Sequence, residues 1–189
     1  MSTTSLFVEL IVIGVGAAGW LGLTILAVFG YKWVNVDSLG SLPLLVPLLS
    51  ITYLLGIVVD RAADRMFDRQ AQRQLRRSFE NRQAYEKARI LAAAKSPLLD
   101  LMEYNRSRLR ICRGWIVNCA ALGISLNAFV WSQLPEELPR ARISVASTLI
   151  VLGLGLGALH AWYRLCSNAY ESLAMQAEML TNSSGKGIS

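Results

Sequence analysis

The chain has 189 residues, enough for about one domain, and carries a formal net charge of +6. Hydrophobic residues make up 53% of it and charged residues only 17%, a balance that argues against a soluble globular protein of this size. Its three cysteines show no CxxC or Cys/His spacing and it has a single histidine, so we expect reduced thiols and neither a metal site nor a cofactor.

Four apolar runs contain most of the hydrophobic residues, and each is about long enough to cross the ~30 Å hydrocarbon core of a bilayer. They cover Leu6 to Phe29, Leu42 to Val59, Gly114 to Trp131 and Ile143 to Trp162. The first run has no Lys or Arg before it and exceeds the about 7–15 residues of a signal-peptide core, which indicates a permanent helix. The sequence therefore predicts an all-α polytopic membrane protein with four transmembrane helices.

The positive charge is concentrated between the second and third runs. Residues 60–113 hold fourteen Arg and Lys against seven Asp and Glu, so this segment carries +7 and the rest of the chain is slightly acidic. By the positive-inside rule the segment stays in the cytoplasm, and four spans then place both termini there too. We therefore expect an integral protein of a membrane such as the bacterial inner membrane.

This topology divides the chain into four parts. Spans one and two occupy 1–59, a basic cytoplasmic helical module occupies 60–113, spans three and four occupy 114–166, and a cytoplasmic tail occupies 167–189. Aromatic residues agree with these boundaries, because amphipathic rings favour the membrane interface. Those at the expected outer boundary are Trp33 and Trp131, and those at the inner one are Trp115, Trp162 and Tyr163.

The module is expected to begin as a continuation of span two. Residues 60–80 contain no Gly or Pro, and an apolar residue recurs at every fourth position, namely Ala63, Phe67, Ala71, Leu75 and Phe79. On such a helix Arg61 can pair with Asp64, and Arg65 can pair with Asp68. We expect a break at Asn81, then a second helix, and a third helix that opens at Ser96 and Pro97 and runs on into span three.

Glu9 is the only acidic residue well inside an expected span, about one turn from its cytoplasmic end. An ionised carboxylate at that position is costly unless it is paired or hydrated. Three interpretations stay open: Glu9 reaches interfacial water, pairs with His160 or Arg164 on span four, or couples the transport of a proton or cation. A glutamate in the first of four spans resembles the coupling carboxylate of small multidrug transporters, which are much shorter and have no basic insertion.

Small residues at four-residue spacing occur in two spans. They are Gly14, Ala18 and Gly22 in span one, and Gly153, Gly157 and Ala161 in span four. Such rows let helix backbones approach closely. They either pack the four helices of one chain together or form a homo-oligomeric interface, and both interpretations stay open. In span three, Asn118, Ser125 and Asn127 are expected to hydrogen-bond between helices.

Nine arginines of the module are candidate contacts for anionic lipid headgroups or for an acidic surface of a soluble partner. They are Arg61, Arg65, Arg69, Arg73, Arg76, Arg77, Arg106, Arg110 and Arg113. Interspersed acids and a shortage of exposed aromatic residues argue against direct nucleic-acid binding.

No nucleophile with a base, metal cluster or cofactor loop is visible in the sequence, so we do not expect an enzyme. The leading hypothesis is a membrane-anchored interaction or sensor component that docks a soluble cytoplasmic partner through the basic module and relays a signal at the membrane. The alternative is a homo-oligomeric channel or pore-forming effector, and the third hypothesis is a small transporter coupled through Glu9. In general architecture the chain resembles membrane components of bacterial antiviral systems, which couple a cytoplasmic sensor to the bilayer.

Overall fold

Five helices account for all the regular structure in the computed structural model, which describes residues 3–32, 42–79, 81–93 and 96–185. They are α1 (Thr3–Phe29), α3 (Leu42–Ser78), α4 (Arg82–Ala93), α5 (Ser96–Gln133) and α6 (Arg140–Gly185). Every helix except α4 is long and apolar enough to cross a membrane. The all-helical prediction and the four apolar helices are therefore confirmed, while Trp33 lies outside the described residues.

α1 ends at a glycine, and its last turn is tied to the end of α5. Gly30 has φ of 77°, a left-handed conformation that suits glycine, and its N–H donates to the Leu26 carbonyl at 3.0 Å. From α5, Ser132 Oγ and Gln133 Nε2 donate to the Ala27 carbonyl at 3.0 and 2.9 Å. Carbonyl groups that a helix end leaves free are thus bonded, and the two helix ends are held together.

Extensions of α3 and α5, together with α4, build the module, and the end of α6 packs against it. α3 runs unbroken from its apolar half to Ser78, and α5 runs unbroken from Ser96 into its own apolar half, as predicted. Between them the side-chain oxygen of Asn81 accepts a hydrogen bond from the N–H of Ala84 at 2.8 Å and caps α4, which confirms the break at Asn81. The fourth apolar helix, α6, continues beyond its apolar run through 167–185, the described part of the segment expected to form the tail.

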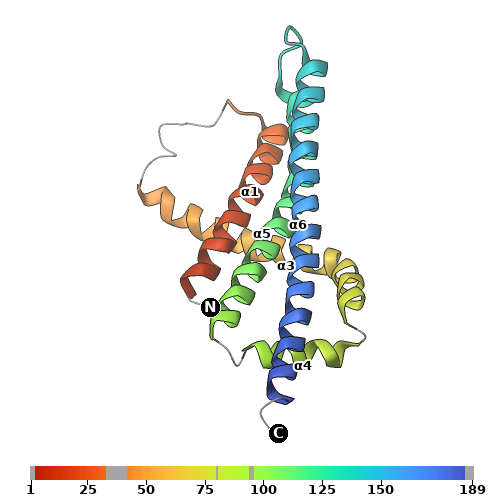
Figure 1. Ribbon diagram of the computed structural model, residues 1–189. Helices are drawn as coiled ribbons and strands as arrows, with labels where there is room; N and C mark the ends of the chain where they lie inside the picture. The colour runs from red at the N-terminus through yellow and green to blue at the C-terminus, as the bar shows by residue number, and fades with distance from the viewer. Residues whose placement is uncertain (1–2, 33–41, 80, 94–95, 186–189) are drawn as a thin grey trace.

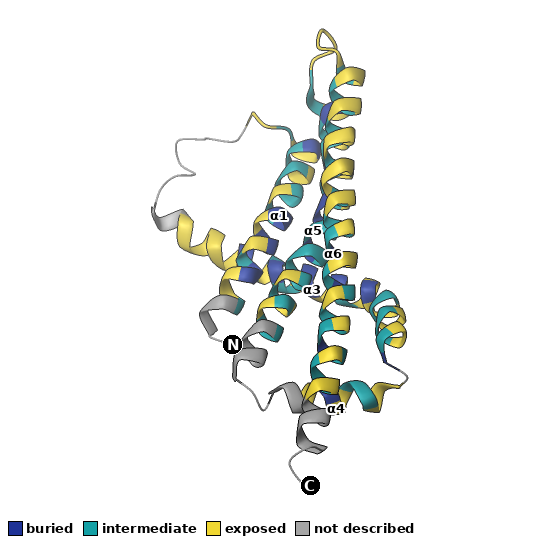
Figure 2. Ribbon diagram, viewed as in Figure 1, coloured by how far each residue is buried: buried dark blue, intermediate teal, exposed yellow. Residues whose placement is uncertain are grey.

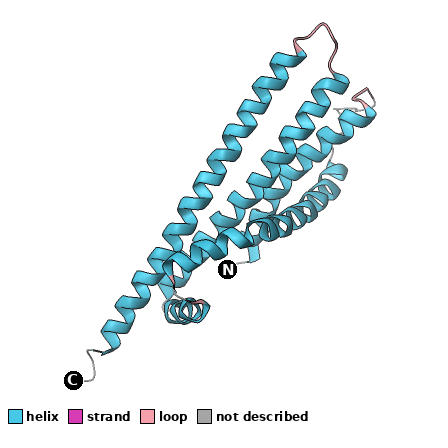
Figure 3. Cartoon of the chain, turned by 90° about the vertical axis from the view of Figure 1, so that its right-hand side faces the viewer, coloured by secondary structure: helices cyan, strands magenta, loops and turns pink. Residues whose placement is uncertain are grey.

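α5 and α6 form a long antiparallel hairpin, and α1 lies against α5 on the side away from α6 (Figure 1). α3 does not run alongside these helices but crosses them in turn. It meets α1 at Gly56, α5 at Asp60 and Asp64, and α6 at Phe67. These contact points follow one another along α3 at intervals of about one turn. The cartoon turned by 90° shows the α5–α6 hairpin and the module at its lower end (Figure 3).

Three buried clusters hold the helices together. Ile13, Ala17 and Val59 pack between α1, α3 and α5; Phe67, Trp162 and Cys166 pack where α3 meets α6; and Phe79, Ala88 and Leu173 join α3, α4 and α6. The apolar four-residue repeat of α3 is thus the face turned inward, since Ala63, Phe67 and Phe79 are buried and Ala71 and Leu75 are half-buried. The prediction that this repeat forms one helix face is confirmed.

The apolar halves of α3 and α6 leave most of their side chains uncovered (Figure 2). None of the most apolar stretch of α6 is buried, and exposed residues there include Val145, Leu149, Ile150, Leu152, Leu154 and Leu156. Soluble monomers rarely expose a contiguous apolar patch larger than a few hundred Å². These faces therefore fit a lipid or protein environment better than water.

The two rows of small residues differ in what surrounds them. A Cβ at Gly14 would overlap the Thr52 carbonyl oxygen, and a Cβ at Gly56 would overlap the Leu10 carbonyl oxygen, so α1 and α3 cross backbone to backbone here. Sequence analysis missed Gly56, because it belongs to no four-residue row. No described residue lies within 4 Å of a Cβ placed at Gly22. The α1 row thus packs one chain together at Gly14.

In the described part of the chain, the small residues Gly153 and Gly157 of α6 have no close neighbours on their outer side. A Cβ placed at Gly153 or Gly157 has no neighbour within 4 Å among the residues that the structure describes. Ala161, like Ala18 on α1, is half-buried. Packing within one chain therefore does not account for Gly153 and Gly157.

We predict that Gly14→Ala lowers the free energy of unfolding by about 1–3 kcal/mol, because the new methyl group forces α1 and α3 apart. Gly22→Ala, two turns further along the same helix, is the matched control and leaves stability unchanged or slightly raised. The measurement is the midpoint of thermal unfolding in a mild detergent. Equal midpoints for the two variants would show that α1 and α3 do not approach this closely.

Candidate functional site

Five charged side chains meet where α1, α3 and α5 cross, and we call them the Arg110 cluster. Arg110 Nη1 lies 3.2 Å from Glu9 Oε2, and Arg110 Nε lies 3.4 Å from Asp60 Oδ1. Arg113 Nη2 lies 2.6 Å from Asp64 Oδ1. Glu9 and Asp60 are only 4% and 6% exposed. Three carboxylates therefore face two guanidinium groups, with Glu9 and Asp60 buried and Asp64 partly exposed.

Helix periodicity places these groups together. Asp60 and Asp64 are one turn apart and share the face of α3 that meets α5, where Arg110 and Arg113 are also about one turn apart. The ion pairs predicted within α3 are accordingly wrong: Asp64 binds Arg113 of α5 and not Arg61. Asp68 also takes a different partner, because its carboxylate accepts a hydrogen bond from Gln72 Nε2 at 2.9 Å.

Glu9 is paired, but not with a residue of α6. His160 and Arg164 are exposed on α6, whereas Arg110 of α5 reaches the carboxylate. The reason is the order of the helices, since α5 lies between α1 and α6 (Figure 1). The sequence held one usable signal, because Arg110 comes only four residues before the third apolar run at Gly114.

Hydrogen bonding within the cluster is incomplete. Glu9 Oε1, Asp60 Oδ1 and the Nε atoms of Arg110 and Arg113 are buried and have no hydrogen-bond partner within the described part of the chain. A buried charge is costly unless an opposite charge lies beside it, and removing one member exposes the others to that cost. The five groups therefore stabilise the crossing only as a set.

Further along α1 and α5, polar side chains also join these two helices by hydrogen bonds. Asn118, fully buried, donates from Nδ2 to the Ile13 carbonyl at 2.8 Å and accepts from Trp20 Nε1 at 3.2 Å. Further along, the hydroxyl groups of Thr24 and Ser125 lie 2.9 Å apart. The prediction that Asn118 and Ser125 hydrogen-bond between helices is confirmed.

The nine candidate arginines fall into two groups. Arg110 and Arg113 face inward and hold the helix crossing. The other seven are exposed, six of them along α3 and one on α5: Arg61, Arg65, Arg69, Arg73, Arg76, Arg77 and Arg106. Of these nine, only the second group is available to a partner or a lipid headgroup.

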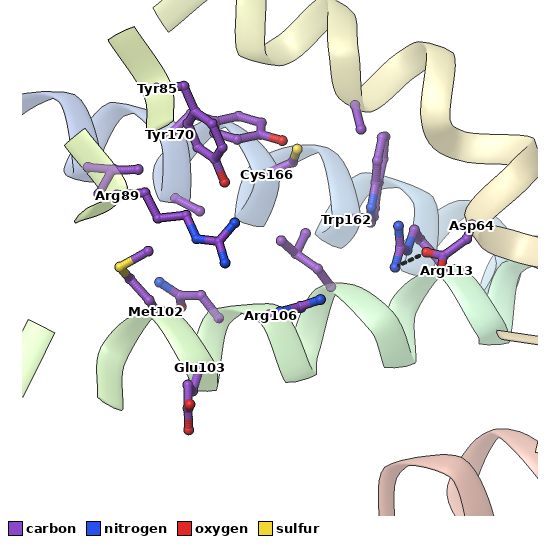
Figure 4. Close-up of a pocket in the computed structure, with 15 residues that line it drawn as sticks. Asp64, Tyr85, Arg89, Met102, Glu103, Arg106, Arg113, Trp162, Cys166 and Tyr170 are labelled. Atoms are coloured by element: carbon purple, nitrogen blue, oxygen red, sulfur yellow. Dashed lines mark ion pairs between the residues drawn. The ribbon is translucent and has the colours of Figure 1, made fainter. Parts of the chain in front are cut away.

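A cavity of about 450 Å³ lies between the module and α6, among α3, α4, α5 and α6 (Figure 4). Asp64 and Arg113 line it, so it borders the Arg110 cluster. Arg89, Arg106 and Tyr170 line it too. Burial raises the pKa of the Tyr170 hydroxyl above its ordinary value, with Cys166 and Tyr85 adding to the shift, so this group stays a neutral donor. Sequence analysis missed Arg89 and Tyr170, which come from distant segments.

No protein-family model, curated protein or solved structure matches this chain.

We predict that Arg110→Met lowers the free energy of unfolding by roughly 3–5 kcal/mol, because it leaves Glu9 and Asp60 buried without a counter-charge. Arg108→Met is the matched control on α5, where the guanidinium lies 4.3 Å from the centre of the Tyr104 ring, and it changes stability by less than about 1 kcal/mol.

Thermal unfolding in mild detergent measures both variants. Adding Glu9→Gln and Asp60→Asn to Arg110→Met is expected to restore much of the loss, since no buried charge is then unpaired. An Arg110→Met protein as stable as Arg108→Met would show that the cluster does not hold the helices together.

Proposed function

We propose that this chain is a membrane-anchored interaction component whose basic module docks a soluble cytoplasmic partner with an acidic surface. The observation that carries the proposal is the separation of charge on the extension of α3. Asp60 and Asp64 are turned inward and neutralised by arginines of α5, whereas Arg65, Arg69 and Arg73 are exposed. Asp68 is the one exposed acid in the described part of this extension. The outer face of α3 thus keeps its positive charge, and complementary charge gives an interface its specificity and association rate.

The uncovered apolar faces of α3 and α6 support the membrane part of the proposal. A bilayer covers such faces without a dedicated partner, and the described parts of all four long helices are apolar over a sufficient length. The Arg110 cluster lies at the boundary between the apolar and charged halves of α3 and α5, at the level where the inner membrane surface is proposed. α3 enters the bilayer at a tilt, because it crosses the other helices.

Orientation follows from the charge of the module. Fourteen basic residues in 60–113 favour the cytoplasmic side, and the four spans then put both termini there. In this arrangement α4 is cytoplasmic and the loop between α5 and α6 is outside.

We predict that Arg65→Gln with Arg69→Gln weakens partner binding by at least about tenfold, because two exposed charges of the docking face are lost. Arg82→Gln with Lys87→Gln removes the same charge from exposed positions on α4 and leaves binding within about twofold. The measurement is recovery of soluble proteins in fixed stoichiometry with the tagged chain from its native host, at low and at high salt. Equal recovery with both double variants would contradict docking through α3.

We predict opposite labelling of two introduced cysteines by a membrane-impermeant maleimide. In intact cells Glu137→Cys, in the exposed α5–α6 loop, reacts, whereas Gln83→Cys, exposed on α4, reacts only after the membrane is opened. The parent chain, whose own three cysteines are buried or half-buried, gives the background. Labelling of Gln83→Cys but not of Glu137→Cys in intact cells would show that the protein has the opposite orientation.

A homo-oligomeric channel is the second candidate, and the open positions Gly153 and Gly157 on α6 favour it. The polar residues of α5 do not, because they bind neighbouring helices of the same chain: Asn127 donates to Thr148 Oγ1 at 2.9 Å and accepts from Ser144. A purified particle made of several copies of this chain alone, together with ion flux through liposomes that contain it, would favour the channel over docking.

A further inference from the structure

The cavity between the module and α6 has the size of a small-molecule site. Its volume of about 450 Å³ lies within the ~300–1,000 Å³ usual for such sites. Four helices line it, with Asp64 from α3, Arg89 from α4, Arg106 from α5 and Tyr170 from α6. It exists only when the extensions of the long helices and α4 are assembled.

Two guanidinium groups give the cavity its charge. Arg113 is already paired with Asp64, but Arg89 and Arg106 are exposed and form no ion pair with any described residue. Figure 4 shows Arg89 reaching from α4 into the space above α5, and Arg106 on α5 below it. Glu103 also lines the cavity, yet its carboxylate points away, to the far side of α5 (Figure 4).

The rest of the lining is largely apolar and aromatic. Leu109, Trp162, Leu173 and Met102 contribute to it, and Trp162 is almost completely buried. The Tyr170 ring packs edge-on against the Tyr85 ring, with 5.9 Å between their centres. A ligand in this space therefore meets cations on one part of its surface and apolar side chains on another.

We propose that the cavity binds an organic phosphate, with Arg89 and Arg106 donating hydrogen bonds to the phosphate group. A guanidinium presents paired donors that match phosphate oxygens, and a phosphate has enough oxygens to bind two of them at once. The cavity is much larger than one phosphate group, so the apolar lining holds the organic part of the ligand. The ligand is either the headgroup of an anionic phospholipid or a soluble phosphate ester.

This proposal goes beyond partner docking, since neither Arg89 nor Arg106 lies on the outer face of α3. A phospholipid headgroup can bind only if the cavity lies beside the inner membrane surface. A soluble phosphate ester has no such requirement. Failure of the docking proposal would leave the binding of an organic phosphate in place.

Isothermal titration of the purified full chain in a neutral, phosphate-free detergent tests the proposal. The probes are phenyl phosphate and dihexanoyl phosphatidylglycerol, and dihexanoyl glycerol is the uncharged control lipid. Binding of phenyl phosphate points to a soluble ester, and binding of phosphatidylglycerol alone points to a lipid headgroup. Either result supports the site, provided that dihexanoyl glycerol does not bind.

The deciding variant is Arg89→Gln with Arg106→Gln, which is expected to bind the probe at least about tenfold more weakly. Arg82→Gln with Arg108→Gln removes the same charge from the same two helices outside the cavity lining, and binding stays within about twofold. Thermal unfolding checks that both variants fold, as expected for exposed positions. The proposal is overturned if neither phosphate probe binds, or if both double variants weaken binding equally.

Discussion

The pairing of Arg110 with two carboxylates from two other helices is the interaction on which the arrangement depends. Glu9 comes from α1 and Asp60 from α3, and both carboxylates are buried, so water does not solvate their charge. Each therefore needs a positive charge beside it. A guanidinium group can serve both, because its donors form a planar fork with several directions, whereas a lysine would offer one point charge. The contact at Gly14 and Gly56 brings α3 close enough to α1 for this bridge to form.

Ion pairing in the interior also explains why the exposed face of α3 is positively charged. α3 carries acids and arginines in alternation, and its inward face takes Asp60 and Asp64 because α5 offers arginines there. The arginines of α3 are consequently left outside, and the module acquires a basic exterior that its overall composition only partly predicts. Ion pairing inside and positive charge outside are two consequences of one helix orientation.

Sequence periodicity was sufficient for features that depend on one helix at a time. The four apolar helices, the inward repeat from Ala63 to Phe79 and the break at Asn81 are all local patterns, and the structure has them. The partner of Glu9, the crossing of α3 and the cavity depend on which helices become neighbours, and periodicity carries no such information. Gly56 illustrates the limit, because an isolated glycine shows no sign of the backbone contact that it permits.

The geometry also sets a condition on any movement of the module relative to the apolar halves of α3 and α5. α3 and α5 each continue from the module into an apolar half, and the Arg110 cluster joins them at the junction. A change in the module that moves α3 relative to α5 has to break the pair of Asp64 with Arg113 or the contacts of Arg110. The pair of Asp64 with Arg113 is partly exposed, so the larger cost lies in the buried contacts of Arg110. Leaving a buried charge without its partner costs roughly 3–5 kcal/mol, and a ligand shifts such an equilibrium only by its difference in affinity for the two states. A partner or organic phosphate would therefore have to bind the moved state some hundreds to thousands of times more tightly to act as a trigger.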